Sequence, residues 1–451
     1  MLKLGGTAGF PSLLLDVKPF FYRNGGMSLA YQAPKGTRDV LPEESYRWQY
    51  IEGLIRDITK KYGLLEARTP VFEHTELFLR GVGKTTDIVQ KEMYTFLDKG
   101  ERSITLKPEG TAGIVRLFVE HNLYGEAQPT KMYYLNNPVF RYERPQAGRL
   151  REHHQFGVEI FGAPRPSADA ECIAIVLELL ERVGLSGLAV RLNSIGCPNC
   201  RPKYQQALRA YLKDNYDALC ETCKTRYELN PLRILDCKTP ACQALLASAP
   251  VIGDFLCDDC RSHMEELQAL LTLMNIRYEI TPTLVRGLDY YTKTVFEVFS
   301  DRIGSQGAIC GGGRYDGLVQ ELGGPSCPGV GFGLGMERLL LLMQESGVEV
   351  PRPQRYDLYL AGLGCEAGRF AFGLAQELRQ LGLCTETDHV GRSAKAQLKY
   401  ADKAGARYVL VIGDDELQKR EAVLKDLRGG ESKSIALNAA AVYQAITQEE
   451  E

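Results

Sequence analysis

The 451-residue sequence lacks any hydrophobic run that approaches the ~18 consecutive apolar residues a membrane-spanning helix needs. It also has little net charge, because 54 basic and 57 acidic side chains leave only −3 at pH 7. Contact with nucleic acid must therefore come from local basic patches rather than from the field of the whole molecule. These two absences exclude a helical membrane protein and a uniformly basic nucleic-acid binder.

The first 26 residues lack both the apolar core and the cleavage site of a secretory signal peptide. A transit peptide is the alternative, although Ser and Arg are few. We predict a disordered extension over residues 1–26, with either Met1 or Met27 as the true start. We also predict a cytoplasmic protein whose 13 cysteines are thiols or metal ligands rather than disulfides.

One short segment is similar to a phosphate loop but lacks that loop's defining parts. GVGKTTD, at residues 81–87, has neither the earlier glycine of the Walker pattern nor a predicted strand before it. We therefore reject a P-loop nucleotide site.

The sequence does contain a strand–loop–strand unit rich in arginine, residues 131–162. Aromatic and β-branched residues predict strands over 131–142 and 155–161, and RPQAGRL between them predicts a loop longer than a tight turn. The arginines of this unit are Arg141, Arg144, Arg149 and Arg151. Permanently charged guanidiniums on a rigid sheet suit a polyphosphate, whereas a solvated hairpin with surface arginines is the alternative.

Hydrophobic patterning divides the rest of the chain. It predicts a first domain over residues 27–347, interrupted at about 197–280 by a polar, mostly helical, cysteine-rich insertion. The Pro/Arg-rich segment 348–356 predicts a linker. Beyond it, alternating strands and helices over 357–451 predict a small α/β domain with a largely parallel sheet.

A strand, a turn and a helix are predicted over residues 103–121, with the helix beginning near Thr111. Glu109 lies in the turn, Pro108-Glu109-Gly110, and Thr111 follows it. A carboxylate and a hydroxyl at this junction could bind an ammonium group. The simpler interpretation is that Thr111 caps the helix and Glu109 complements its dipole.

Three glycine- or tyrosine-containing blocks follow in the second half. LVRGLDYY carries Arg286 before Tyr290 and Tyr291, GGGRYDG carries Tyr315, and GVGFGLGMERL precedes a helix with Arg338. The alternate glycines of the last block are Gly331, Gly333 and Gly335. Glycines let a flat ligand such as a purine lie on the strand, and an arginine could then stack on it or pair with a phosphate. Each block alone is weak evidence, because glycine-rich strands are often tight packing sites.

The order of the blocks is more specific. RYERP in a strand–loop–strand, then LVRGLDYY, GGGRYDGL and GFGLGMERL, resembles the class II histidyl-tRNA synthetases over about residues 30–445. The resemblance implies an α+β catalytic domain with an antiparallel sheet and flanking helices, a mostly helical insertion, and a C-terminal α/β anticodon-binding domain. KGTRDVLP and the strand broken by Pro70 resemble the start of that family and its dimer-forming first motif.

The resemblance also implies a ligase that activates histidine with ATP and Mg²⁺ to histidyl-adenylate and transfers it to the 3′ end of tRNA(His). It implies a homodimer with no membrane partner. The residues matched to catalytic positions are Arg141, Arg286 and Arg338. Those matched to histidine binding are Glu109, Thr111, Gln155, Glu159, Tyr290, Tyr291 and Tyr315. Those left for the ATP phosphates and the tRNA acceptor end are Arg144, Arg149, Arg151, Gly331, Gly333 and Gly335.

Two alternatives share the fold. A non-catalytic regulatory paralogue serves ATP phosphoribosyltransferase, but such paralogues typically lack the C-terminal domain and lose catalytic residues, whereas this chain keeps RGLDYY and a domain after Arg355. A proline or threonine enzyme of the same class is disfavoured by LVRGLDYY. The basic residues expected near one helical face of the C-terminal domain are Arg392, Lys395, Lys399 and Lys403. They suit RNA backbone contact, and a solvated helix face is the alternative.

The insertion contains three CxxC pairs, a pattern typical of zinc sites. The candidate ligands are Cys197, Cys200, Cys220, Cys223, Cys237, Cys257 and Cys260, and Cys242 lies among them in the sequence. Members of the resembling family keep this insertion without the cysteines, so reduced thiols are the alternative to structural zinc.

Overall fold

The computed structural model describes residues 31–83, 86–145, 148, 150–300, 308–430 and 432–448. The expected extension over 1–26 and the loop residue Arg149 lie outside the described residues. Contacts divide the chain into two compact units. The first comprises Tyr62–Leu177 and Gly187–Leu341 with the described part of Met1–Val40; the second comprises Leu41–Lys61, Glu178–Ser186 and the described part of Leu342–Glu451. The domain boundaries expected from the sequence stay predictions.

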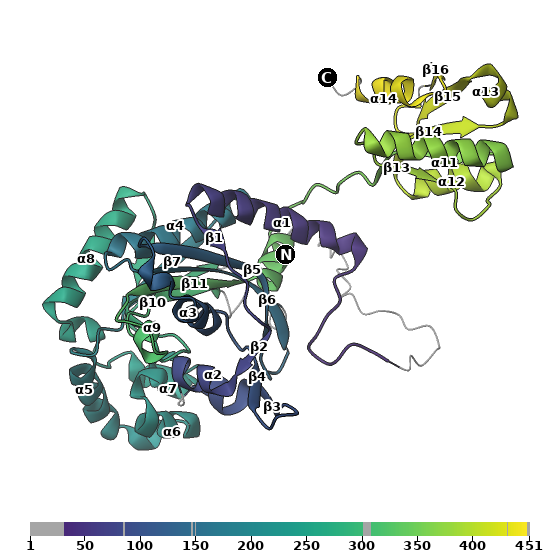
Figure 1. Cartoon of the computed structure of the whole chain (residues 1–451). Helices are drawn as coiled ribbons and strands as arrows, with labels where there is room; N and C mark the ends of the chain where they lie inside the picture. Colours follow the sequence, from purple (N-terminus) through teal and green to yellow (C-terminus); the bar gives the residue numbers. More distant parts are fainter. Residues whose placement is uncertain are drawn as a thin grey trace, which may run out of the picture. The chain divides into compact units, whose positions relative to one another are not determined.

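The first unit is built on an eight-stranded sheet of order β1-β5-β6-β11-β10-β9-β7-β8 (Figure 1). The six central strands are β5 (Thr130–Phe140), β6 (Glu152–Phe161), β11 (Gly329–Gly335), β10 (Ala308–Arg314), β9 (Thr292–Ser300) and β7 (Leu188–Ser194). Within this set of six, neighbouring strands pair antiparallel, as the resemblance predicts. Two short strands form the edges of the sheet: β1 (Leu65–Glu66) pairs in parallel with β5, and β8 (Tyr278–Ile280) pairs in parallel with β7.

A second, three-stranded sheet and several helices complete this part. The sheet has the order β2-β4-β3, with β2 (Phe72–His74), β4 (Ser103–Leu106) and β3 (Tyr94–Leu97). The helices are α2 (Thr75–Gly81), the π-helix η1 (Ile88–Glu92), α3 (Thr111–Glu120), the 3₁₀ turn η2 (Leu123–Gly125), α4 (Pro166–Arg182), α9 (Leu318–Glu321) and α10 (Met336–Glu345). Helix α2, not a strand, precedes the rejected phosphate loop. Helix α3 begins at the predicted residue, and its buried Phe118 stacks on Phe161 of β6 with ring centroids 4.4 Å apart.

The insertion is helical, as predicted, and shares a core with the large sheet. Its elements are α5 (Arg201–Lys213), η3 (Tyr216–Ala218), α6 (Glu221–Leu229), η4 (Pro231–Asp236), α7 (Pro240–Leu246), η5 (Ile252–Phe255) and α8 (Asp258–Leu273). Tyr204 and Leu208 of α5 belong to the same hydrophobic cluster as Val285, Tyr290 and Tyr291. The insertion is therefore packed against the segment that carries the LVRGLDYY block.

The second unit contains α1 (Pro42–Lys61), whose Trp48, Ile51, Ile55 and Ile58 are buried. Its sheet has the order β13-β12-β14-β15-β16, with β13 (Thr385–Thr387), β12 (Tyr356–Gly362), β14 (Ala406–Ile412), β15 (Glu421–Asp426) and β16 (Ser432–Ala436). Its other helices are α11 (Cys365–Gln380), α12 (Ala394–Lys403), α13 (Asp414–Lys419) and α14 (Ala439–Thr447).

The prediction of a largely parallel C-terminal sheet is only half right. Strands β13, β12 and β14 pair in parallel, but β15 and β16 add an antiparallel hairpin. The hairpin strands are short and half-exposed, with Ala422 and Leu424 buried between exposed neighbours, so they lack the continuous apolar run of a central parallel strand. Across the part of the chain that the structure describes, no helix has the length and apolarity to span a membrane.

Candidate active site

The strand register places most of the predicted site residues on one face of the large sheet. Glu159 of β6 lies opposite Gly331 of β11, and Gln155 lies opposite Gly335. Because side chains alternate between the faces of a strand, Gln155, Glu159 and the alternate glycines of β11 share a face. On the same face, Gly311 of β10 lies between Gly333 and Glu297 of β9.

Glu159 is the buried centre of this face, with 0% exposure. The Thr111 hydroxyl donates to Oε1 at 2.8 Å, the Tyr134 hydroxyl donates to the same oxygen at 3.4 Å, and the Tyr315 hydroxyl donates to Oε2. Burial raises the pKa of Glu159 to about 8. The structure therefore concentrates a titratable acceptor and three hydroxyls, which can donate or accept, in one enclosed place.

The N-terminus of α3 supplies a second carboxylate to the site. Both oxygens of Glu109 accept backbone hydrogen bonds at 2.7 Å, from the N–H groups of Thr111 and Ala112. Burial raises the pKa of this carboxyl group. The Glu109 side chain therefore caps the helix from the position before the N-cap residue Gly110. The interpretation of Thr111 as the capping residue is wrong, because its hydroxyl donates to Glu159. Nearby, Arg141 Nε donates to the Pro108 carbonyl at 2.8 Å.

Three tyrosines form an aromatic wall beside Glu159. The rings of Tyr290 and Tyr291 have centroids 4.7 Å apart, and Tyr290 meets Tyr315 edge-on at 5.7 Å. All three are buried. The structure thus brings together the residues predicted for one small polar ligand. Gln155 lies on the same strand as Glu159, four residues earlier, and is half-buried.

Arg286 lies on the same face beside Gly311. A Cβ atom at Gly311 would overlap the Arg286 guanidinium, so only glycine leaves space for it there. The guanidinium pairs with Glu297, and its Nε meets no hydrogen-bond acceptor among the described residues. The side chain is 22% exposed, so the cation is held in place and open to a ligand.

The three alternate glycines of β11 have different surroundings. A Cβ at Gly331 would overlap the Glu159 carboxylate, so this glycine is needed for packing. At Gly333 and Gly335 the nearest described side-chain atoms would be 3.7 Å and 3.8 Å away, which leaves open strand surface. Arg338, at the start of α10, is half-buried and donates to the Ala308 carbonyl at 2.5 Å.

The described arginines of the hairpin loop, Arg144 and Arg151, differ in their exposure and contacts. Arg144 is exposed. Arg151 has its guanidinium 4.1 Å from the centre of the Tyr142 ring, and its Nε donates to the Glu143 carbonyl at 3.1 Å. Its backbone N–H also donates to the Gly36 carbonyl at 2.8 Å. Arg151 therefore ties the loop to the start of the described chain.

Sequence reasoning missed several residues of the site. Tyr134 occupies space that only glycine leaves at Gly110 and Gly157, since a Cβ at either position would overlap its ring. Arg314, in the middle of GGGRYDG, is fully buried and pairs with the fully buried Asp169 of α4. For Tyr134, the available signal was the presence of Gly110 and Gly157 near a strand with two tyrosines. For Arg314, its position beside three glycines gave no signal that the side chain is buried.

Comparison with known proteins agrees with this geometry. Residues 36–339 match the family model of histidyl-tRNA synthetases, and residues 358–443 match that of anticodon binding domains. The histidine–tRNA ligase of Caldanaerobacter subterraneus subsp. tengcongensis is 58% identical over 407 residues, which cover 90% of this chain and 97% of the relative.

Two solved structures are similar as well. Apo histidyl-tRNA synthetase of S. aureus superposes with a TM-score of 0.79 at 39% identity, over 92% of this chain and 99% of that one. An ATP phosphoribosyltransferase regulatory subunit/histidyl-tRNA synthetase from Bacillus halodurans has a TM-score of 0.59 at 23% identity, over 86% and 99% of the two chains, which shows the fold alone. The chain therefore belongs to the histidyl-tRNA synthetase family of aminoacyl-tRNA ligases, with its class II catalytic fold followed by an anticodon-binding domain.

Proposed function

We propose that the chain is a histidine–tRNA ligase that forms histidyl-adenylate from histidine and ATP and then acylates the 3′ end of tRNA(His). The observation that carries the proposal is the buried Glu159 with its ring of hydroxyls. Glu159 accepts an imidazole N–H, and Tyr291 lies against the ring. A site built to satisfy a polar ring rejects apolar analogues by about 10⁴-fold, because its own polar groups would be left unpaired.

The α-amino group of histidine is assigned to Glu109, Thr111 and Gln155, while Tyr290 and Tyr315 line the pocket. Glu109 already accepts two backbone hydrogen bonds, but each carboxylate oxygen has a further lone pair for an ammonium group. Helix capping and substrate binding are therefore compatible roles for one side chain.

The phosphate groups of ATP are assigned to the arginines. The histidine carboxylate attacks the α-phosphorus, the bond to the bridging oxygen breaks, and pyrophosphate leaves. Both reactants are anionic, so Arg141 and Arg286 draw them together and offset the charge of the transition state, while Arg338 binds the γ-phosphate end. No general base is needed, because the carboxylate is already ionised. The open strand at Gly333 and Gly335 accommodates the adenine.

Mg²⁺ accompanies ATP in this proposal. The arginines offer it no ligand, so the phosphate oxygens and water would bind it, as is usual for this ion. It would neutralise part of the phosphate charge.

The tRNA is assigned to two surfaces, each in its own unit. We assign Arg144, Arg149 and Arg151 to the ATP phosphates and the acceptor end, as the resemblance implies. In the C-terminal domain, Lys395, Lys399 and Lys403 are exposed on or beside α12, which supports contact with RNA phosphates. Arg392 pairs with Asp388 at 2.6 Å, so it contributes less free charge.

We further propose a homodimer and a cytoplasmic location. Around Pro70, the apolar side chains of Leu65 and Phe72 are 74% and 56% exposed, and Phe96 of the adjacent sheet is 48% exposed. Phe72, Phe96 and Ile104 line a hollow of about 430 Å³ on that sheet. Exposed apolar surface of this kind favours a second copy of the chain as its cover.

ATP–pyrophosphate exchange with each of the twenty amino acids tests the proposal. Exchange that depends on histidine alone is the expected result. Exchange with another amino acid would refute the assignment of the pocket, and absence of exchange with all twenty would favour the regulatory paralogue.

A further inference from the structure

The cysteines of the insertion fold into two separate groups of four. Cys197 and Cys200 meet Cys257 and Cys260, although the two pairs lie far apart in the sequence. The second group is made by Cys220, Cys223, Cys237 and Cys242, so Cys242 belongs with the candidates that the sequence identified. Within each group all four sulfur atoms lie within 4.8 Å of one another.

The spacing of the sulfur atoms fits a single tetrahedral metal ion in each group. Zn–S bonds of about 2.3 Å at tetrahedral angles place the sulfur atoms about 3.8 Å apart. The Cys197 sulfur lies 3.7 Å from those of Cys200 and Cys257, and Cys200 lies 3.8 Å from Cys260. In the second group, Cys220 and Cys237 are 3.8 Å apart. A disulfide requires about 2.05 Å, and a cluster of several irons spreads its thiolates wider than one ion does.

The surroundings of both groups also suit thiolates. Cys200, Cys220 and Cys257 occupy the N-cap positions of α5, α6 and α8, where the helix dipole favours negative charge. Backbone N–H groups point at the sulfurs as well: Cys220 N donates to Cys242 Sγ at 3.3 Å, and Thr239 N donates to Cys237 Sγ at 3.4 Å. Hydrogen bonds of this kind, from groups that do not bind the metal themselves, orient the ligand atoms toward it.

The first group is joined directly to the aromatic wall of the active site. Arg201 follows Cys200 and donates to the Tyr291 carbonyl at 2.5 Å and to the Ile195 carbonyl at 3.2 Å. The backbone beside the group, at Gly196, accepts a hydrogen bond of 2.9 Å from Lys293 N at the start of β9. A fixed Cys197–Cys200 turn therefore fixes the backbone of Tyr291.

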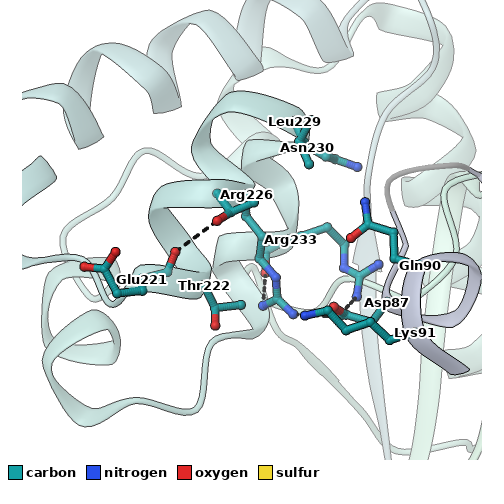
Figure 2. Close-up of a pocket in the computed structure, with 10 residues that line it drawn as sticks. Asp87, Gln90, Lys91, Glu221, Thr222, Arg226, Leu229, Asn230 and Arg233 are labelled. Atoms are coloured by element: carbon teal, nitrogen blue, oxygen red, sulfur yellow. Dashed lines mark hydrogen bonds and ion pairs between the residues drawn. The ribbon is translucent and has the colours of Figure 1, made fainter. Parts of the chain in front are cut away.

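The second group is joined to the other end of the same segment. Between Cys223 and Cys237, Arg233 donates to the Gly287 carbonyl at 3.0 Å, and Asn230 Nδ2 donates to Asp289 Oδ1 at 3.0 Å. Arg226 and Arg233 both pair with Asp87, at 2.8 Å and 3.2 Å, and all three residues line a pocket of about 250 Å³ (Figure 2). Segment 286–291 is thus held by hydrogen bonds that begin beside both cysteine groups.

We propose that the insertion binds two zinc ions, each by four thiolates, and that the two ions brace segment 286–291 of the histidine pocket. Each ion replaces the four thiol protons of its group. The first ion fixes the start of α5, from which Arg201 reaches the segment, and the second fixes both ends of the stretch between Cys223 and Cys237, which carries Asn230 and Arg233. In this proposal the zinc ions do not contact histidine, ATP or tRNA. Arg201, Asn230 and Arg233 therefore position the pocket and take no part in the reaction. The proposed zinc binding does not depend on the proposed function. The proposed effect on histidine binding does depend on that function.

Metal analysis of the full chain, purified without chelator, tests the binding. We expect about two zinc ions per chain, and about one after either Cys220→Ser or Cys257→Ser, since each removes a ligand from one group. Cys384→Ser, at an exposed cysteine outside both groups, is the matched control and should retain both ions. If a variant fails to fold, titration of the unmodified chain with a mercurial reagent replaces it, and both zinc ions should be released as the thiolates react. Iron in place of zinc, disulfides, or about one zinc or less in the unmodified chain would overturn the proposal.

A second variant separates the brace from the metal. Arg233→Gln should keep both zinc ions but raise the KM for histidine in pyrophosphate exchange about tenfold, with a smaller effect on kcat. Arg209→Gln, an exposed arginine of the same insertion, should change neither. An unchanged KM in Arg233→Gln would refute the brace. An unmodified chain with two zinc ions but no exchange would refute the proposed function and leave the zinc sites standing.

Discussion

The guanidinium of Arg286 lies in the space that a side chain at Gly311 would fill. The two residues come from different blocks of the sequence, LVRGLDYY and GGGRYDG, and meet only because β10 lies between β9 and β11. The glycine leaves the space, and Glu297 on the neighbouring strand pairs with the cation. The arginine proposed as catalytic thus occupies space that exists because Gly311 has no side chain.

Gly311→Ala should therefore displace Arg286 and lower kcat in histidine-dependent pyrophosphate exchange by about 10²-fold, because a misplaced cation no longer meets the α-phosphate. Gly317→Ala is the matched control: it lies in the same block, and a Cβ there would meet no described atom within 4 Å. It should retain normal activity. Equal rates for Gly311→Ala and the unmodified chain would remove Arg286 from the mechanism.

Glu159 should give histidine use a characteristic pH dependence. Its pKa is raised to about 8 by burial, so the ionised acceptor becomes more abundant as pH rises toward 8 and beyond. We expect kcat/KM for histidine to rise over this range. In Glu159→Gln, kcat/KM should fall by about 10²- to 10³-fold and lose that rise. Titration of histidine itself is common to both proteins, so identical pH profiles would contradict the role of Glu159.

The same pKa shift predicts a change in stability with pH. The unliganded folded state holds a proton on Glu159 that the unfolded chain releases near 4.5, so its contribution is full below 4.5 and is lost as pH rises through about 8. Urea unfolding of the unliganded protein at several pH values should show a larger loss in the unmodified chain than in Glu159→Gln, where the raised pKa of Glu109 still contributes. Glu120→Gln, at an exposed helix position, should behave like the unmodified chain.

Arg314 and Asp169 form a fully buried ion pair, and His263 lies 3.3 Å from the same carboxylate. Arg314→Ala should lower the free energy of unfolding by about 3–5 kcal/mol, because the buried Asp169 carboxylate loses its guanidinium partner and keeps only the His263 ring beside it. Arg314→Met combined with Asp169→Asn should cost less than the sum of the two single changes. Denaturant titration measures Arg314→Ala and the four proteins of the cycle, which are the unmodified chain, the two single variants and the double variant. Strictly additive losses in the cycle would show that the pair is not coupled.

The exposed apolar surface around Pro70 should be the dimer interface. Phe72→Arg is expected to weaken self-association by about 10²-fold or more, since it places a charge in a covered apolar contact. Leu273→Arg is the matched control, because Leu273 is 78% exposed but lies in the insertion. Sedimentation velocity over a concentration series distinguishes them. A stable dimer for Phe72→Arg would place the interface elsewhere.

Local patterns carried most of what could be predicted. Strand propensity identified β5 and β6, and a Pro-Glu-Gly turn located the start of α3. The order of the sequence blocks carried the resemblance from which the pocket residues were predicted. What the sequence could not reveal depends on contacts between distant segments. Tyr134 reaches Glu159 because the β5–β6 register places Tyr134 opposite Gly157. Cys197 and Cys200 meet Cys257 and Cys260 because α5 and α8 begin side by side. The spacing within a CxxC motif cannot predict such a contact.

Charging of unfractionated tRNA with each radiolabelled amino acid tests the central claim most directly. The account predicts that this chain, with ATP and Mg²⁺, forms histidyl-tRNA up to the fraction of tRNA(His) in the mixture and leaves the other nineteen amino acids unused. Failure to form histidyl-tRNA under conditions where the chain is folded, or charging with a different amino acid, would contradict it.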